Sequence, residues 1–320
     1  MQVIFNPLKS IPNVNKYQDN SNKNKTYLQT KPDVVSFSAR DFLSLPEDVI
    51  FERIIKSVNN PENLIGTGSS AEVYKIENTS YCVRIPYDEE TKKDEYYMIN
   101  CCSDFNLNVL DKDKVNHVVA RLGGGATIMK KINGSPVLDI KTNAEGAIKS
   151  AIKVSKLPLS AYCDLLHQIA DAYKQDMVFD AYGTNVIADT QNLVAIDFNK
   201  MNPRYKEPLK PLISMYESLV CVSEVPTKVE NAIIKKILKA ALKEVEPGQK
   251  PCVELDELDT LDFISWIYRF KKIDEEQFEN LWDNFNDVRN YKSVELAGLN
   301  SEPVLARKIA ETSKLVDEIF

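Results

Sequence analysis

The sequence between residues 179 and 199 reads FDAYGTNVIADTQNLVAIDFN. Two short apolar runs, NVIAD and LVAIDF, flank the polar turn DTQN, which predicts two β-strands joined by a tight turn. Asp180 lies five residues before Asn185, and Asp197 lies twelve residues after it. At this spacing two carboxylates and one amide can converge on one point and hold Mg²⁺ on phosphate oxygens. The simpler alternative is that all three are turn and cap residues of a β-hairpin.

A second segment, residues 63–86, reads NLIGTGSSAEVYKIENTSYCVRIP. Its alternating apolar residues around ENTS predict a β-hairpin, preceded by a glycine-containing turn. Glycines such as Gly66 and Gly68 let backbone amides approach phosphate oxygens closely. Arg84, in the second strand, carries a permanent charge that can clamp phosphate. An ordinary hairpin turn and a solvent-exposed edge-strand arginine are the alternatives.

The first segment resembles the protein-kinase-like superfamily, whose catalytic loop carries an Asp, four residues and an Asn, followed after a strand pair by Asp-Phe-Gly. Here the matching residues are Asp180-x4-Asn185 and Asp197-Phe198-Asn199. The resemblance implies that Asp180 is the catalytic base and that Asn185 and Asp197 are the metal ligands. It therefore implies a phosphotransferase that uses ATP and Mg²⁺.

The second segment resembles the glycine-rich loop G-x-G-x-x-G-x-V of the same superfamily. Arg84 stands where protein kinases carry a phosphate-binding lysine, so it is assigned a catalytic as well as a nucleotide-binding role. Glu95, or Glu89 or Glu90 in its place, is the expected helix carboxylate that orients Arg84. The segment 127–134 resembles the last strand of a small lobe and the linker that binds adenine. The expected nucleotide contacts are Gly66, Thr67, Gly68, Ser69, Ser70, Val73, Arg84, Glu95, Met129, Lys131 and Ile132.

Several positions depart from the family pattern. Ala71 replaces the third glycine of the loop, Val178-Phe179 replace the His-Arg before the catalytic Asp, and Asn199 replaces the glycine after Asp-Phe. The V-R-I strand at Arg84 also resembles choline kinases and aminoglycoside phosphotransferases. The expected acceptor is therefore a hydroxyl of an unidentified protein or small molecule. The alternative is a pseudokinase scaffold that binds nucleotide or a partner protein without turnover, and a divergent bacterial effector kinase fits by analogy.

We expect an α+β, bilobal protein-kinase-like fold, with a small antiparallel β lobe and a larger, mainly helical lobe. Four regions are predicted: a disordered tail at 1–40, an N-terminal β-rich lobe at 41–134, a C-terminal lobe with the catalytic and metal loops at 135–224, and a helical extension of that lobe at 225–320. Apolar residues at helical spacing predict helices at 41–58, 89–103, 159–176, 210–222, 227–246, 257–271, 274–290 and 303–318.

The composition narrows the class of protein. Hydrophobic residues make up 43% and charged residues 27% of the chain, and no apolar stretch approaches the ~20 residues of a membrane span. The net charge of −7 argues against nucleic acid as a partner, and Lys235, Lys236 and Lys239 are interpreted as a solvated helix face. Six cysteines without CxxC and two histidines favour reduced thiols over structural zinc. We expect a cytoplasmic protein, or one exported into a host cell without a cleaved signal.

Overall fold

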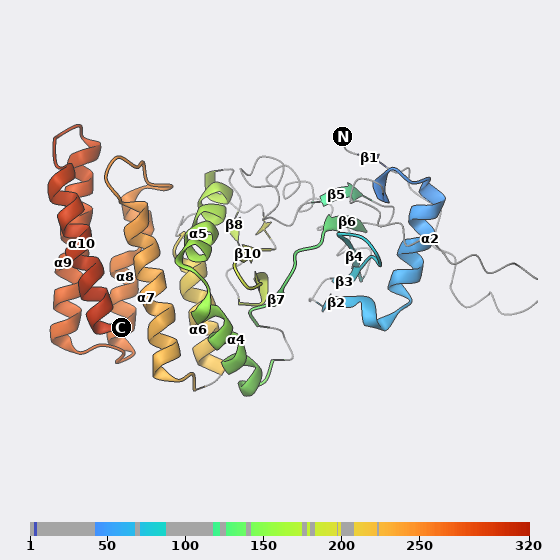
Figure 1. The fold of residues 1–320 in the computed structure, drawn as a ribbon, viewed down its shortest axis with the longest axis horizontal. Helices are drawn as coiled ribbons and strands as arrows, with labels where there is room; N and C mark the ends of the chain where they lie inside the picture. The colour runs from blue at the N-terminus through green and yellow to red at the C-terminus, as the bar shows by residue number, and fades with distance from the viewer. Residues whose placement is uncertain are drawn as a thin grey trace, which may run out of the picture. The chain divides into compact units, whose positions relative to one another are not determined.

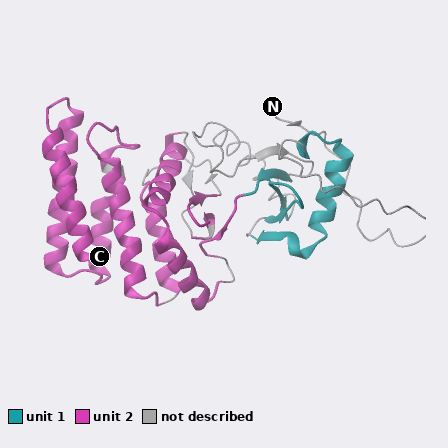
Figure 2. Cartoon of the chain, viewed as in Figure 1, with its two compact units in different colours: residues 1–99, 118–131 teal, residues 100–117, 132–320 magenta. Residues whose placement is uncertain are grey.

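A computed structural model describes most of the chain (Figure 1). The described residues are 3–4, 42–67, 71–87, 118–121, 126–138, 142–174, 178–179, 183–196, 198–199, 208–222 and 224–320. The chain divides into two compact units (Figure 2): residues 1–99 with 118–131, and residues 100–117 with 132–320. The sequence predicted an α+β protein with a small sheet and a helical part, and this general prediction is confirmed.

The first unit contains a six-stranded sheet in the order β1-β5-β6-β4-β3-β2. All neighbours pair antiparallel except β1 and β5, which pair in parallel. Strand β1 consists of two residues within the range 1–40. The prediction that this whole range is a disordered tail is therefore wrong for these two residues. The strands are β1 (Val3–Ile4), β2 (Leu64–Thr67), β3 (Ala71–Lys75), β4 (Tyr81–Pro86), β5 (Val118–Arg121) and β6 (Thr127–Lys130).

Helix α2 (Glu47–Val58) covers one face of this sheet. It begins after Pro46, whose fixed φ suits a helix start, and it has Glu47 in its first turn, where the helix dipole favours negative charge. Ile50 and Ile54, one helical turn apart, pack with Val83 and Ile128 of the sheet. Val83 and Ile128 are fully buried. The predicted helix over 41–58 is thus confirmed for its second part, followed by the short 3-10 turn η2 (Pro61–Asn63).

The second unit begins with short strands and two helices. β7 (Ser135–Pro136), β9 (Val186–Ala188) and β10 (Leu193–Ala195) form a sheet in the order β10-β9-β7. β8 (Val178–Phe179) and β11 (Phe198–Asn199) pair separately, and η4 (Gly183–Asn185) precedes β9. The predicted pair of strands around DTQN is confirmed as β9 and β10. The helices are α4 (Ala144–Lys156), which the sequence analysis missed, and α5 (Leu159–Lys174).

The rest of the second unit is helical and shares one hydrophobic core with α5. Leu166 of α5, Ile237 of α7, Ile264 of α8 and Leu305 of α10 all belong to it and are fully buried. Residues beyond 224 therefore belong to the same unit as the short strands. The elements are α6 (Lys210–Val222), α7 (Thr227–Glu244), η5 (Leu255–Leu258), α8 (Thr260–Arg269), α9 (Glu275–Leu296) and α10 (Glu302–Ile319), which confirm the five helices predicted after residue 209.

Candidate functional site

The expected nucleotide-binding residues of the first unit form a row across its sheet. Gly66 pairs with Val73, Val73 pairs with Arg84, and Arg84 pairs with Thr127. Directly paired residues of an antiparallel sheet project their side chains from the same face. The backbone register therefore brings Gly66, Val73 and Arg84 onto one face, although they lie on three different strands.

This face of the sheet is the one opposite to α2. Val83 lies between Cys82 and Arg84 in β4, and successive side chains of a strand point to opposite faces. Because Val83 packs in the core with α2, its neighbour Arg84 projects from the other side. Arg84 and Val73 are each only partly buried there. A partly buried guanidinium on this face is a suitable phosphate contact.

Met129 lies on the same face, two residues beyond Thr127 in β6, and is 7% exposed. Its carbonyl oxygen accepts a hydrogen bond from Cys82 Sγ at 3.7 Å. Burial raises the pKa of the Cys82 thiol to about 12, so this thiol is neutral and unreactive. Lys131 and Ile132, both partly buried, follow β6 and straddle the boundary between the two units.

Thr127 was not among the expected site residues. Its side chain is 2% exposed, and in the part of the chain that the structure describes its hydroxyl is a buried group with no hydrogen-bond partner. Buried polar atoms of this kind are rare in native proteins. Because Thr127 pairs directly with Arg84, the unsatisfied hydroxyl fits a polar ligand at this face. The sequence signal was a lone hydroxyl residue in the apolar run of β6.

Some expected site residues fall outside the described ranges. β2 ends at Thr67, which is exposed and pairs with Glu72, and β3 begins at Ala71. The glycine-rich segment therefore connects two paired strands. The hairpin predicted around ENTS is confirmed as β3 and β4, which pair antiparallel. The expected residues that lie outside the described part of the chain are Gly68, Ser69, Ser70, Glu95 with its alternatives Glu89 and Glu90, Asp180 and Asp197.

In the second unit, the backbone joins the neighbours of Asp180, Asn185 and Asp197, the residues predicted for the catalytic and metal site. Phe179, which precedes Asp180, pairs with Phe198, which follows Asp197. The carbonyl oxygen of Asn185 accepts a hydrogen bond of 2.8 Å from the N–H of Ile196. Ile196 is the residue before Asp197. Each aspartate is therefore one peptide bond away from a residue that is fixed in this small network.

The same network is tied to the rest of the unit. The N–H of Val137 donates to Val186 O at 2.8 Å, and the N–H of Leu138 donates to Gly183 O at 3.1 Å. Gly183 is packed so closely that a Cβ atom there would lie 3.2 Å from side-chain atoms of both Leu138 and Ser218. This close packing fixes the loop that carries Asn185 against β7 and α6.

Gln168 of α5 positions the strand that leads to Asp197, and the sequence analysis missed it. Its Nε2 donates to Leu193 O at 3.2 Å, and its Oε1 accepts from the N–H of Ala195 at 3.1 Å. The side chain is 6% exposed. One amide thus satisfies the outer edge of β10. The available signal was a glutamine on the apolar stripe of a helix, between Leu165 and Ala172.

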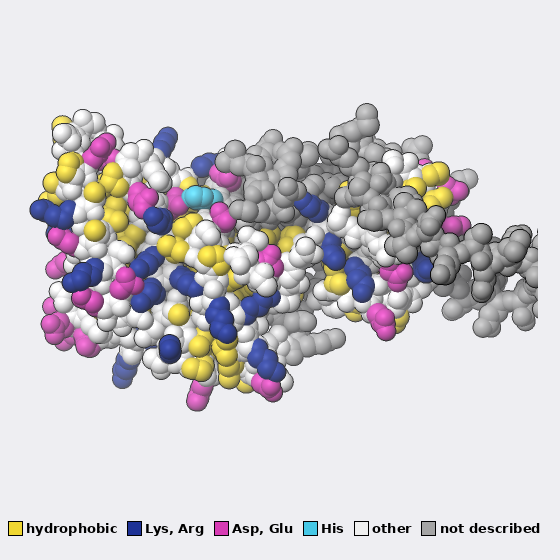
Figure 3. Space-filling model, viewed as in Figure 1, with side chains coloured by type: hydrophobic (Ala, Val, Ile, Leu, Met, Phe, Trp, Pro, Cys, Tyr) yellow, Lys and Arg dark blue, Asp and Glu magenta, His cyan; other side chains and the backbone are white. Residues whose placement is uncertain are grey.

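The basic residues of α7 hold neighbouring elements rather than forming a solvated face. Lys236 donates to the backbone carbonyl oxygens of Ser155 and Leu157 at the end of α4. Lys239 and Lys235 contact Asp317 of α10 at 2.7 and 3.3 Å. The hydrogen bond from Lys239 holds the pKa of Asp317 below its usual range. On the described part of the face in Figure 3, basic and acidic side chains are interspersed.

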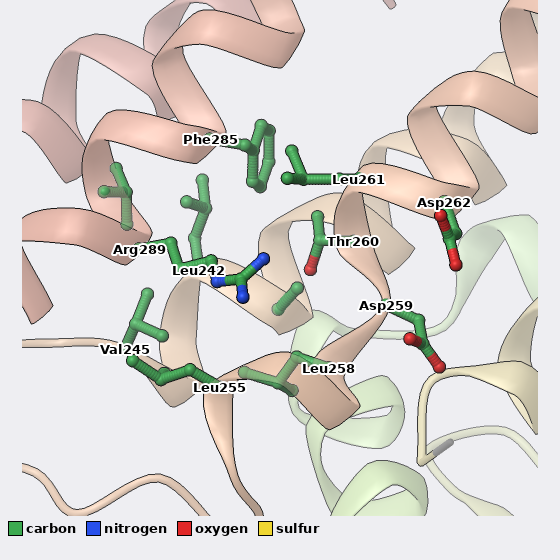
Figure 4. Close-up of a pocket in the computed structure, with 12 residues that line it drawn as sticks. Leu242, Val245, Leu255, Leu258, Asp259, Thr260, Leu261, Asp262, Phe285 and Arg289 are labelled. Atoms are coloured by element: carbon green, nitrogen blue, oxygen red, sulfur yellow. The ribbon is translucent and has the colours of Figure 1, made fainter. Parts of the chain in front are cut away.

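A cavity of about 110 Å³ lies in the second unit, between α7, η5, α8 and α9 (Figure 4). Most of the residues that line it are apolar, among them Leu242, Leu258 and Phe285, and Arg289 enters it from α9. Of the expected site residues that the structure describes, none lines it. The cavity therefore does not coincide with the hydrogen-bonded network around Asn185, which the sequence motif makes the stronger candidate site.

No helix within the described part of the chain is long and apolar enough to cross a membrane. No protein-family model matches the chain, and its comparison with curated proteins gave no match.

Proposed function

We propose that the chain is a phosphotransferase of the protein-kinase-like superfamily that moves the γ-phosphoryl group of ATP to a hydroxyl of a protein or small molecule. The observation that carries this proposal is the network in the second unit. Phe179 pairs with Phe198, and Asn185 bonds to Ile196. These links support the proposal that Asp180, Asn185 and Asp197 converge, which a shared metal and catalytic centre requires.

Each residue of the centre has a distinct role in this proposal. Asp180 orients the acceptor hydroxyl and takes its proton, a task for which a carboxylate is well suited. Asn185 and Asp197 provide an amide and a carboxylate oxygen, the ligand types that Mg²⁺ prefers. When bound, Mg²⁺ would neutralise the negative charge of the phosphates.

The row of residues in the first unit supports nucleotide binding. Gly66 lies in β2 at the start of the glycine-rich segment, where backbone amides can approach phosphate oxygens. Arg84 projects from the same face, and its planar fork can bond two phosphate oxygens at once. The unsatisfied hydroxyl of Thr127 beside Arg84 supports a polar ligand there. Met129 and the segment that follows it would then contact the adenine ring.

The bilobal arrangement is part of the proposal, with the sheet unit as the small lobe and the helical unit as the large lobe. The run β2-β3-β4, with the cation on the third strand, supports it because protein kinases also carry their phosphate-binding cation on the third strand. The enzyme would act in a cytoplasm, its own or that of a host cell. The proposed acceptor is a hydroxyl group, because the proposed base Asp180 would take the proton of a hydroxyl.

Phosphate transfer from γ-labelled ATP tests the proposal. The full chain is incubated with Mg²⁺ and a panel of acceptors: the chain itself, general protein substrates, choline and aminoglycosides. We expect label in at least one acceptor, and Asp180→Asn should lower the rate by ~10²–10⁴-fold, as for loss of a general base. Asp283→Asn, at an exposed aspartate of α9, is the matched control and should leave the rate unchanged.

Arg84 gives a second, independent readout. Arg84→Ala should raise the KM for ATP more than it lowers kcat, and Arg84→Lys should restore part of the loss because the charge is retained. Lys56→Ala, at an exposed lysine of α2, is the control within the same unit. ATP binding without transfer to any acceptor would favour the scaffold alternative. Absence of both binding and transfer would contradict the proposal.

A further inference from the structure

His167, Glu244 and Cys252 form a cluster of metal-ligating side chains away from the proposed phosphotransfer centre. One potential ligand atom from each residue lies within 4.8 Å of the other two. We propose that these three side chains bind a zinc ion. The inference is independent of the proposed phosphotransfer, because none of the three residues belongs to that centre.

Three separate segments of the second unit bring these residues together. His167 lies on α5, Glu244 is the last residue of α7, and Cys252 follows in the loop after α7. α5 and α7 pack against one another (Figure 1). The loop turns back at Gly248, whose φ is +73°, and the N–H of Cys252 donates to Glu244 Oε2 at 3.4 Å. The site is thus built by the packing of two helices and one reversed loop.

The ligand set selects the kind of metal. One imidazole nitrogen, one carboxylate oxygen and one sulfur suit Zn²⁺, whereas Mg²⁺ and Ca²⁺ prefer oxygen ligands alone. Asp164 and Asp171 lie one helical turn before and after His167 on α5 and add negative charge beside it. The nearby cations Lys174 and Lys243 are paired with Asp171 and Glu246. The local charge balance therefore favours a divalent cation.

The distances require only small movements on binding. His167 Nε2 and Glu244 Oε1 are 2.5 Å apart, at hydrogen-bond distance. Two ligands of one tetrahedral zinc, each bonded at ~2.0–2.1 Å, lie ~3.3 Å apart. The pair must therefore open by about 1 Å, and the sulfur, which lies within 4.8 Å of both atoms, must close by no more than a similar amount. His167 can move, because its side chain is 53% exposed. The Glu244 side chain is only 6% exposed and is held in place.

Binding is an exchange of protons for the metal, with no redox change. Zn²⁺ takes the place of the proton shared by His167 and Glu244, and the Cys252 thiol loses its proton as the Zn–S bond forms. Both protons pass to solvent. Three protein ligands leave the fourth position of a tetrahedral zinc for water or an external ligand. The exposure of His167 makes that position reachable from solvent.

Titration of the reduced, tag-free full chain with Co²⁺ after removal of metal by a chelator tests the site. Co²⁺ reports on zinc sites through visible bands of tetrahedral geometry and a sulfur-to-cobalt charge-transfer band. We expect one equivalent to produce both signals and one equivalent of Zn²⁺ to abolish them. Cys252→Ser should remove the charge-transfer band, and His167→Asn should weaken Zn²⁺ binding by at least ~100-fold, since loss of an outer-shell partner alone costs 10–100-fold.

Two controls separate this site from other thiols. Cys221→Ser, at an exposed cysteine of α6, and the double change Cys101→Ser with Cys102→Ser should leave both signals intact. Circular dichroism of each variant establishes that it is folded. Failure of the wild-type chain to bind one equivalent would overturn the inference. So would a charge-transfer band that survives Cys252→Ser or that disappears when Cys101 and Cys102 are replaced.

Discussion

Helix α5 serves two different clusters with two adjacent residues. Gln168 faces β10 and bonds to the backbone of Leu193 and Ala195, in the segment that leads to Asp197. His167 faces solvent and bonds to Glu244, beside Cys252. The first cluster, the network within residues 179–198, is assembled by backbone hydrogen bonds over a short stretch of chain. The second is assembled by side chains from segments up to 85 residues apart, from His167 to Cys252.

This difference explains which cluster the sequence can predict. A backbone network within residues 179–198 follows from strand and turn signals and from residue spacing, both of which are local. The His167 cluster depends on how α5 and α7 pack and on a loop reversal at Gly248. Neither the helix packing nor the loop reversal has a local sequence signal. A side-chain cluster of this kind can therefore be found only from the structure.

The largest expected effect on stability is at Gly134, which packs against β9, the strand that follows Asn185. Gly134 has φ +128°, and a Cβ atom there would lie 2.5 Å from the carbonyl oxygen of Ala188 in β9. Gly134→Ala should lower the free energy of unfolding by on the order of 3 kcal/mol or more, since both strain and a backbone clash oppose it. Urea unfolding measures this change.

Gly248→Ala is the matched control for that substitution. Gly248 has φ +73°, but a Cβ atom there would meet no atom within 4 Å. Only the left-handed conformation opposes the change, so the expected loss is about 1–2 kcal/mol. Equal losses at Gly134 and Gly248 would contradict the view that the strand region is the more tightly packed of the two.

A smaller effect is expected at Gln168. Gln168→Leu leaves the N–H of Ala195 and the carbonyl of Leu193 without their partner, in a site where the glutamine side chain is 6% exposed. The expected loss in unfolding free energy is ~2–3 kcal/mol, because each unsatisfied buried group costs ~1–3 kcal/mol. It should also lower the rate of phosphate transfer, because Asp197 follows β10.

Gln249→Leu provides the comparison for Gln168. Gln249 is exposed and bonds only to Glu246 within its own turn, so its replacement should change stability by less than ~0.5 kcal/mol. If Gln168→Leu were as mild as Gln249→Leu in thermal unfolding and in phosphate transfer, the positioning role of Gln168 would be refuted.

Other parts of the fold show the same limit of local prediction. α6 occupies residues 210–222, as predicted from apolar spacing. α4 was missed because its fully buried positions include Ala147 and Ala151, whose small side chains give a weak hydrophobic signal. β1 pairs with β5, a contact between residues more than 110 positions apart. No pattern within Val3–Ile4 identifies that partner.

The candidate site divides in a similar way. Two apolar runs and a polar turn predicted the strand–turn–strand that follows Asn185, and the register then placed Gly66, Val73 and Arg84 on one face. Sequence reasoning had grouped these residues by motif and could not derive the face. It overlooked Thr127 and Gln168 because a polar residue inside an apolar run is informative only when its burial and its partners are known.

A smaller effect than that of Gln168→Leu is expected as a pH dependence at the turn between β9 and β10. Asp189 Oδ1 accepts from the N–H groups of Gln191 and Asn192, each at 2.6 Å. Burial acts to raise the pKa of Asp189, but these hydrogen bonds outweigh it and hold the pKa below the ordinary value of 3.8. The carboxylate therefore stabilises the fold fully above about pH 3.8, and this contribution is lost as the pH falls through the folded-state pKa.

Urea unfolding of wild type and Asp189→Asn between pH 6 and pH 2 measures this effect. The variant should be less stable at pH 6 by up to ~1 kcal/mol, because Asp189 is only partly buried and solvent still screens its charge. The difference should shrink toward zero at the lowest pH. A constant difference over the whole range would show that the charge of Asp189 does not contribute.

The most direct test of the metal and nucleotide centre is calorimetric titration of the full chain with ATP, with and without Mg²⁺. The wild-type chain should bind one ATP at least ~10-fold more tightly with Mg²⁺, a difference of about 1.4 kcal/mol. Asp197→Asn should lose that Mg²⁺ dependence, and Asp283→Asn should keep it. Failure of the wild type to show Mg²⁺-dependent ATP binding, or full dependence in Asp197→Asn, would contradict the proposed function.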